Sequence, residues 1–417
     1  PDLQPWVDAI GSRTNFQLAY QGLDDCTLQS QYGQWVSGLM QRAFGDRPIE
    51  KSHARVRIRV GFVSSFWWHH TVGKLFRGWI ENLDSSQFDI RVYHVGKRRD
   101  ELTTAIEASA DGYLSHRSWQ AMAEAIEAEC PDILIYPEVG MDSTTLQLAA
   151  LRLAPVQCVA WGHPITTGLP SMDYFLTSDP MEPGGADASY SETLVRLPKL
   201  SITYRRPTLP KLTLTRADLN LPEERTLYLC CQSLFKYLPT YDDIFARIIE
   251  ADPHGHLVFI ENKSTRVTQT FRERLTGVFE RIGVEFEGAV SFVPQLRFEA
   301  YLQLNGLADV YLDSIGWSGG NTTLEALAWG TPMVTLRGQW MRGCHSAAVL
   351  EELGLAHWIA DSPDTFIELA TRLGKDQALR ETVRKTIRER SSDVYDNLEP
   401  VRALEAFILE VAEPKPR

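Results

Sequence analysis

The sequence of 417 residues predicts an α/β protein made of two successive doubly wound domains. Three observations support this prediction. The length exceeds what one hydrophobic core usually holds. From residue 55 onward, short runs rich in Val, Ile and Tyr alternate with amphipathic helical stretches, as in parallel sheets covered by helices. The alternation stops at residues 206–224, where three prolines and mixed charge indicate a linker, and then begins again.

The expected elements follow in chain order. In the first domain (51–205), we expect strands at 55–65, 88–95, 132–136, 157–161 and 174–177, and helices at 74–83, 118–130 and 144–153. In the second domain (225–390), we expect strands at 226–231, 256–261, 290–293, 309–312 and 332–336, and helices at 242–250, 265–282, 323–329 and 347–353. Residues 1–50 predict a helical prefix, with segments at 18–23 and 32–44. Residues 391–417 predict a C-terminal helix (401–411) that crosses back onto the first domain.

Composition argues against two classes of protein. The formal net charge of −12 does not suit binding to a nucleic-acid backbone, which depends on a surplus of Lys and Arg. No run approaches the ~20 apolar residues of a membrane span. The six cysteines form no CxxC pair, which predicts free thiols in a reducing, cytoplasmic compartment. The start at Pro1, without Met or a signal peptide, is expected of a domain cut from a longer chain.

The most informative segment is 312–325, LDSIGWSGGNTTLE, in which a strand is followed by a glycine-rich turn and a helix. Gly319 and Gly320 let the backbone approach a phosphate, and the first N–H groups of the helix point at it. Thr322 and Thr323 add hydroxyl donors, and Glu325 can accept the hydroxyls of a ribose. The alternative is structural, because Thr322 and Glu325 have the spacing of a capping box. The segment departs from GxGxxG, which disfavours a Rossmann dinucleotide site.

Three further segments carry candidate chemistry at expected strand ends. Lys236, in CQSLFK, can neutralise a diphosphate leaving group, although a surface lysine is the simpler reading. His69 and His70 end the aromatic segment SSFWWHH, where a histidine can act as general base or orient a substrate. A core histidine is the alternative, and no ligand spacing for zinc accompanies the pair, so we expect no metal site. In WGHPITTG, a fixed turn is expected to present His163 at its tip, beside Pro164, unless the turn is purely structural.

At these residues the chain resembles the family-41 glycosyltransferases, which include O-linked N-acetylglucosamine transferases, SPINDLY-like proteins and adhesin N-glucosyltransferases. The matching text is VGFVSS…HH, LRLAPVQCVAWGHPITTGLPSMDYFLTSD, YSETLVRLP, QSLFK, LADVYLDSIGWSGGNTTLEALAWGTPMVT and MRGCHSAAVL, between about residues 55 and 353. The resemblance implies a GT-B fold, in which two Rossmann-like domains face each other across a cleft. It also implies that catalysis needs no metal or other cofactor, and that UDP lies mainly against the second domain.

The resemblance also implies roles for particular residues. His70 corresponds to the active-site histidine of the family and Lys236 to its phosphate-binding lysine. Tyr301 stands where a histidine stacks on the uracil. The implied donor-binding residues are Ser233, Phe235, Pro294, Gln295, Tyr301, Gly319, Gly320, Asn321, Thr322, Thr323 and Glu325, and those on the acceptor or sugar side are His69, His163 and Pro164. Cys344 replaces a common arginine, Phe235 replaces a tyrosine, and the GHP at His163 resembles the N-glucosyltransferases.

The function that the resemblance implies is an inverting transfer of a sugar, N-acetylglucosamine in first place, from a UDP-sugar to Ser or Thr of a protein. One alternative is a UDP-glucose-dependent transfer to Asn. A UDP-sugar epimerase or hydrolase, or a module that only binds UDP, are the others. The expected partners are the UDP-sugar and a protein or peptide acceptor. Helical repeats that select the acceptor are expected upstream of Pro1 and absent from this chain.

Overall fold

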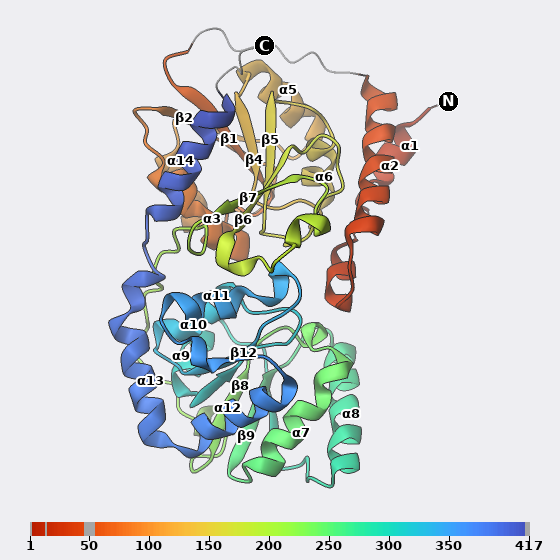
Figure 1. The fold of residues 1–417 in the computed structure, drawn as a ribbon. Helices are drawn as coiled ribbons and strands as arrows, with labels where there is room; N and C mark the ends of the chain where they lie inside the picture. Colours follow the sequence, from red (N-terminus) through yellow and green to blue (C-terminus); the bar gives the residue numbers. More distant parts are fainter. Residues whose placement is uncertain (1, 13–14, 46–54, 413–417) are drawn as a thin grey trace. The chain divides into compact units, whose positions relative to one another are not determined.

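Figure 1 shows the computed structural model, which describes residues 2–12, 15–45 and 55–412. The described chain divides into two compact units. Unit 1 holds the residues up to Arg205 together with those from Asp396 onward, and unit 2 holds Arg206–Tyr395. Each unit has its own parallel sheet with helices packed against it, so the predicted α/β class is confirmed. No helix in the described ranges is long and apolar enough to cross a membrane.

The sheet of unit 1 has seven parallel strands in the order β3-β2-β1-β4-β5-β6-β7. Its central strands are continuous apolar runs because both faces of a parallel sheet are covered. All four residues of β4, for example, are buried. The order reverses between β1 and β4, and open α/β sheets bind ligands beside such a reversal, at the carboxyl ends of the strands. The strands are β1 (Ile58–Ser64), β2 (Phe88–His94), β3 (Gly112–Ser115), β4 (Ile133–Tyr136), β5 (Val156–Ala160), β6 (Tyr174–Ser178) and β7 (Thr193–Leu197).

One helix of unit 1 comes from the far end of the chain. α14 (Glu399–Ala412), dark blue in Figure 1, packs against α3 (Thr71–Asn82) and β7. Its Glu405 carboxylate accepts a hydrogen bond from the Asp84 amide at 2.8 Å. The sequence predicts that residues 391–395 belong with this C-terminal helix, but they are part of unit 2. The other helices of the unit 1 sheet are α3 (Thr71–Asn82), α4 (Glu101–Ser109), α5 (Trp119–Glu129) and α6 (Ser143–Ala149).

The N-terminal prefix consists of α1 (Gln4–Ala9), a 3₁₀ helix (Asn15–Gln21) and α2 (Cys26–Phe44). It packs directly on the rest of unit 1. Gln147 Nε2 donates to the Val7 carbonyl at 2.9 Å. Gly33 of α2 lies against the backbone of Gly168, so close that a Cβ on Gly33 would be 2.2 Å from the Gly168 carbonyl carbon. The expected helical segment at 18–23 is the 3₁₀ helix, and α2 begins well before residue 32. Residues 46–50 of the predicted prefix lie outside the described residues.

The sheet of unit 2 has six parallel strands in the order β10-β9-β8-β11-β12-β13. Here the order reverses between β8 and β11, so the loops after these two strands flank the crevice of this unit. The strands are β8 (Thr226–Cys230), β9 (Gly255–Ile260), β10 (Val290–Val293), β11 (Val310–Leu312), β12 (Met333–Leu336) and β13 (Ile359–Ala360). The helices are α7 (Asp242–Ala251), α8 (Thr265–Ile282), α9 (Phe298–Leu307), α10 (Asn321–Ala328), α11 (His345–Glu352), α12 (Pro363–Lys375) and α13 (Gln377–Glu389).

The segment expected to be a linker, residues 206–224, is packed onto unit 2. Arg216 anchors it, because its guanidinium donates to the Glu223 and Arg225 carbonyls at 3.0 and 2.7 Å. The same guanidinium pairs with Asp309 at 2.9 Å, just before β11. The prolines and mixed charge of this stretch therefore mark an extended segment that belongs to one unit.

Candidate functional site

The glycine-rich segment forms a tight turn between β11 and α10 in unit 2. Gly316 has φ +88°, a left-handed conformation that glycine adopts without strain. Gly319 packs against the start of α10, where a Cβ would lie 2.5 Å from Thr323 Oγ1 and 2.6 Å from Thr322 Oγ1. Glycine is therefore required at position 319 for this close approach.

The start of α10 is not capped by a side chain. Gly320 is the N-cap residue, and Asn321 begins the helix. Thr322 lies inside the first turn, so the structural alternative, a capping box between Thr322 and Glu325, is excluded. The first N–H groups of a helix carry a partial positive charge and bind anions such as phosphate.

The carboxylate of Asp313 holds the turn in place. Its Oδ1 accepts from the Ser314 and Gly319 amides at 2.9 and 2.8 Å. Its Oδ2 accepts from the hydroxyls of Ser318 and Thr335 at 2.6 and 2.8 Å. Burial nevertheless raises the pKa of Asp313 above its ordinary value. Asp313 is absent from the predicted site; the signal for it is its place as the first polar residue after β11.

Lys236 and Thr322 belong to one hydrogen-bonded cluster. Lys236 Nζ donates to Gln232 Oε1 at 3.0 Å, and Gln232 Nε2 donates to Thr322 Oγ1. Nζ also lies 5.4 Å from the centroid of the Trp317 ring. Burial lowers the pKa of Lys236 to about 8, and the charge of Asp313 acts in the opposite direction. The ammonium is thus mostly protonated at neutral pH. Gln232 is also missing from the predicted site, although it is the first polar residue after β8.

This cluster lies where the sheet of unit 2 reverses its order. Lys236 follows β8 and the glycine-rich turn follows β11, and these strands are direct neighbours. The reversal point of a doubly wound sheet opens a crevice between the two diverging loops. A cation and a helix N-terminus at that crevice can bind a diphosphate.

Other predicted donor-binding residues lie along the same edge of the unit 2 sheet. Ser233 and Phe235 are exposed in the loop after β8, and Pro294 and Gln295 are exposed directly after β10. Tyr301, on α9, reaches back toward the end of β8, with its hydroxyl 3.5 Å from Cys231 Sγ.

Three of the predicted donor-binding side chains are inside the protein. Thr323 is fully buried, and its Oγ1 lies 2.7 Å from Ser346 Oγ. The prediction that its hydroxyl faces a diphosphate is wrong, because it joins α10 to α11. Glu325, one turn into α10, is 2% exposed, and Asn321 is buried at the first helical position. Cys344, the replacement for an arginine, is buried with Sγ 3.3 Å from the Gly338 carbonyl.

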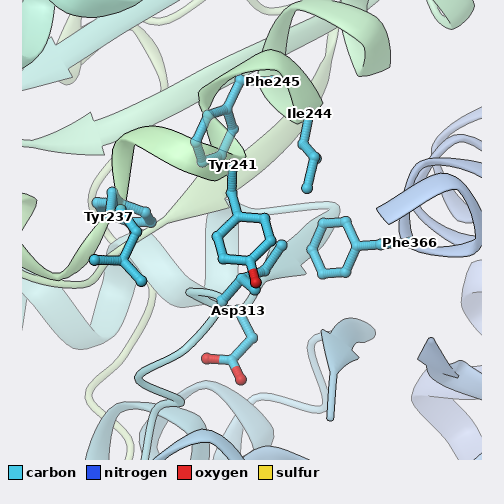
Figure 2. Close-up of a pocket in the computed structure, with 8 residues that line it drawn as sticks. Tyr237, Tyr241, Ile244, Phe245, Asp313 and Phe366 are labelled. Atoms are coloured by element: carbon cyan, nitrogen blue, oxygen red, sulfur yellow. The ribbon is translucent and has the colours of Figure 1, made fainter. Parts of the chain in front are cut away.

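A small cavity lies behind the turn (Figure 2). Its volume is about 10 Å³, which is the size of one water. Figure 2 shows aromatic rings on one side and the Asp313 carboxylate directed away from them. The cavity is lined by Tyr237, Leu238, Tyr241, Ile244, Phe245, Asp313, Ile315 and Phe366. A space of this size does not admit a nucleotide.

In unit 1, His70 is the N-cap of α3. Its Nδ1 accepts from the Val72 amide at 3.3 Å. The ring stacks on Phe66 with centroids 4.4 Å apart and lies 5.1 Å from the ring of Trp68. Burial lowers the pKa of His70 to about 4, and the charges of Lys74 and Arg98 act in the same direction. The ring is therefore neutral at physiological pH, with its proton on Nε2.

The adjacent His69 has a different environment. Its side chain is about half exposed, and its Nδ1 lies 3.3 Å from Asp100 Oδ2. The same carboxylate oxygen accepts the His69 amide at 2.7 Å. Asp100 also caps α4. His69 thus connects the loop after β1 to the loop after β2.

A buried carboxyl supports the loop that leads to His70. Glu138, which follows β4, accepts from Ser64 Oγ at 2.9 Å, and Ser64 Oγ accepts from the Phe66 amide at 2.9 Å. Burial raises the pKa of Glu138 well above its ordinary value. β1 and β4 are the strands at which the unit 1 sheet reverses. Like Asp313 and Gln232, Glu138 lies at a candidate site and is absent from the predicted site residues.

His163 is not presented at an exposed tip. It is 2% exposed, and its ring stacks on Phe16 of the prefix with centroids 5.2 Å apart. Pro164 is also buried. The prefix covers this turn, and Glu192 fixes it by accepting from the Thr167 amide at 2.8 Å. The expectation of a displayed histidine is wrong because the prefix, far away in sequence, packs on it.

No group of His, Cys, Asp and Glu within the described ranges has a metal-binding arrangement. No disulfide joins the six cysteines, all of which are described.

Known proteins are similar to this chain in architecture and in sequence. Thermobaculum terrenum O-GlcNAc transferase, solved as a mutant, superposes with a TM-score of 0.79 at 26% identity, over 95% of this chain and 75% of that one. A probable UDP-N-acetylglucosamine–peptide N-acetylglucosaminyltransferase SPINDLY from Petunia hybrida is 27% identical over 79% of this chain. A UDP-glucose:protein N-β-glucosyltransferase from Actinobacillus pleuropneumoniae is 26% identical over 62% of it.

The chain spans 36% of the length of the Petunia protein and 40% of the Actinobacillus protein. The sequence model described as glycosyl transferase family 41 matches residues 38–212 and 205–399. These two matches take in most of the chain and both parallel sheets, and we conclude that the protein belongs to glycosyl transferase family 41.

Proposed function

We propose that this protein transfers a sugar, N-acetylglucosamine, from a UDP-sugar to Ser or Thr side chains of a protein acceptor. The observation that carries the proposal is the cluster of Lys236, Gln232 and Thr322 at the reversal point of the unit 2 sheet. Relatives named as UDP-N-acetylglucosamine–peptide transferases support the choice of donor and acceptor.

The proposed reaction is an inverting displacement that uses no metal. The acceptor hydroxyl oxygen forms a bond to the anomeric carbon while the bond from that carbon to the diphosphate oxygen breaks, and UDP leaves with the electron pair. Lys236 and the uncapped start of α10 stabilise the negative charge of the leaving diphosphate. Glu325 is assigned to the ribose by its place in the family motif; its carboxylate is buried in this structure.

We assign His70 an orienting role. Its Nδ1 is already engaged by the Val72 amide, so the neutral ring offers Nε2–H as a donor. This arrangement favours transfer of the acceptor proton to a phosphate oxygen of the donor.

Calorimetric titration with UDP tests the donor site. We expect Lys236→Ala to weaken UDP binding about 10- to 100-fold, since charge-assisted hydrogen bonds contribute about 1.5–3 kcal/mol. Glu325→Gln, which keeps the shape of a buried side chain, is expected to weaken binding of both UDP and uridine. In the wild type, UDP affinity is expected to fall as the pH rises through about 8, where Lys236 loses its proton. Lys375→Ala, which changes an exposed lysine in the last turn of α12, is the matched control.

Product analysis then tests the chemistry. UDP-GlcNAc and UDP-glucose are each incubated with Ser/Thr peptides and with Asn-containing peptides. Glycosylated Ser or Thr from UDP-GlcNAc supports the proposal, and glucosylated Asn indicates the alternative transferase. Free or epimerised sugar without any glycopeptide, or UDP binding unaffected by Lys236→Ala, overturns it.

A further inference from the structure

A group of cations lies at the carboxyl edge of the unit 1 sheet. Strands β3, β2 and β1 are neighbours in a parallel sheet, so the loops that follow them leave the sheet at the same edge. These loops are residues 116–118, 95–100 and 65–70, respectively. These loops contain four Lys or Arg residues and one carboxylate. The cations are Lys97, Arg98, Arg99 and Arg117, and the carboxylate is that of Asp100. We call these four cations the cationic edge; it is a local exception in a chain of net charge −12.

Most of the nearby carboxylates already have partners. Asp100 accepts the His69 amide at 2.7 Å and the Leu102 amide at 3.0 Å, and Glu107 pairs with Arg99. Glu101 is left exposed in the first turn of α4.

Three cations of the edge, by contrast, are available to a ligand. Lys97, Arg98 and Arg117 are exposed and form no ion pair with any residue in the described ranges. The loops therefore present more positive than negative charge to solvent.

The cationic edge begins beside His70, the candidate active-site residue of unit 1. The Arg98 guanidinium lies 4.6 Å from the centroid of the Trp68 ring, and that ring is 5.1 Å from the ring of His70. An anionic group bound by Arg98 would thus be a few residues of extended chain, at ~3.3 Å per residue, from a hydroxyl at His70.

We propose that the cationic edge selects acceptor segments in which the modified Ser or Thr is flanked by Asp or Glu. This inference rests on the proposed function and adds the chemical class of the acceptor. The diphosphate of the donor is accounted for by Lys236 and α10 in unit 2, which leaves the unit 1 cations for another anionic ligand. A nucleic-acid backbone is disfavoured by the overall charge of −12, because such binding requires a broad basic surface.

The test uses one acceptor sequence in four versions, with zero, two or four Asp residues, or four Lys residues, around the same Ser. Glycopeptide formation gives kcat/KM, and fluorescence anisotropy gives peptide affinity without turnover. We expect both to increase with the number of Asp residues and to fall as NaCl increases, because exposed charges are screened by salt. Lys97→Gln/Arg98→Gln is expected to lower kcat/KM for the four-Asp peptide about three- to tenfold, since exposed ion pairs contribute only weakly in water.

Two controls separate charge from structure. Arg281→Gln/Lys375→Gln removes the same charge at two exposed residues in the last turns of α8 and α12 and is expected to leave peptide preference unchanged. Arg98→Lys keeps the charge but loses the guanidinium that lies over Trp68, and it should retain the preference for Asp. The KM for the UDP-sugar should be the same in all variants.

The outcomes distinguish failure of the inference from failure of the proposed function. Equal use of acidic and neutral peptides by the wild type overturns the inference and leaves the transferase intact. A rise in donor KM in Lys97→Gln/Arg98→Gln also overturns it, since the cations would then serve UDP. In competition binding, a neutral peptide that displaces the labelled four-Asp peptide as readily as unlabelled four-Asp peptide does would also overturn the inference. Asp-dependent binding without glycopeptide from any donor supports the cationic edge and contradicts the proposed function.

Discussion

Four donors meet at the carboxylate of Asp313, two amides from the turn and two hydroxyls from Ser318 and Thr335. Asp313→Ala leaves these buried donors without their acceptor, and each unsatisfied group costs about 1–3 kcal/mol. The loss of four such contacts costs at least about 4 kcal/mol, so we expect the turn to lose its shape and unit 2 to be destabilised by about 4 kcal/mol or more. UDP affinity is expected to fall at least about tenfold while uridine affinity changes little, because the turn faces the diphosphate in the proposed function.

Calorimetry with UDP and with uridine, together with a denaturant titration, measures these effects. Thr335→Val keeps a side chain of similar volume but removes one of the two hydroxyl donors to the Asp313 carboxylate. It serves as the milder variant. Equal loss of UDP and uridine affinity in Asp313→Ala would show a general collapse of unit 2 rather than a local change in the turn.

Helix α2 contains two glycines in opposite environments. A Cβ on Gly33 would lie 2.2 Å from both the carbonyl carbon and the oxygen of Gly168, whereas a Cβ on Gly38 meets nothing within 4 Å. Gly38→Ala should therefore stabilise unit 1 by about 0.5–1 kcal/mol through helix propensity. Gly33→Ala should destabilise it by about 1–3 kcal/mol, because the helix must move away from the turn that carries His163.

Thermal and urea unfolding of the two single variants measure this contrast within one helix. A stabilising effect of both substitutions would mean that α2 does not pack on residues 163–168 in solution.

The elements that could be predicted from the sequence are those with a strong local pattern. The apolar run at 290–293 and the amphipathic run at 265–282 match β10 and α8 in full. The sequence does not predict β3, because Gly112–Ser115 is an edge strand without a buried residue and has no apolar run. The sequence does not predict α9 either, because its apolar and polar residues are not segregated to opposite faces.

Side-chain contacts of the site could be predicted only in part. The positions of Lys236 and Thr322 at strand ends follow from the alternation of strands and helices. The bridge by Gln232 depends on the direction of a side chain, which no periodicity encodes. The burial of His163 depends on Phe16, which lies in another part of the chain and reaches it only through the packing of the prefix.

Both units contain buried histidines that folding keeps neutral. Burial lowers the pKa of His94, in unit 1, and of His256 and His345, in unit 2, to about 4. In the unfolded chain a histidine has a pKa of about 6.5, so between pH 6.5 and 4 the unfolded state binds more protons. The free energy of unfolding should therefore decrease as the pH falls through this window, by up to about 1.4 kcal/mol per pH unit for each histidine. The raised pKa of Glu138 acts in the opposite direction in unit 1.

His256 offers a clean test of this linkage in the whole protein. Its ring lies between the Gly288 carbonyl, 3.1 Å from Nδ1, and Ser291 Oγ, 2.8 Å from Nε2, an arrangement that suits a neutral ring with one donor and one acceptor. Glutamine can offer the same pair of groups without titrating. Urea unfolding of the wild type and of His256→Gln at pH 7 and pH 5 should show that the variant loses less stability on acidification, by about 2 kcal/mol. An identical loss in both proteins would mean that His256 titrates normally in the folded state, and that acid sensitivity arises at other groups.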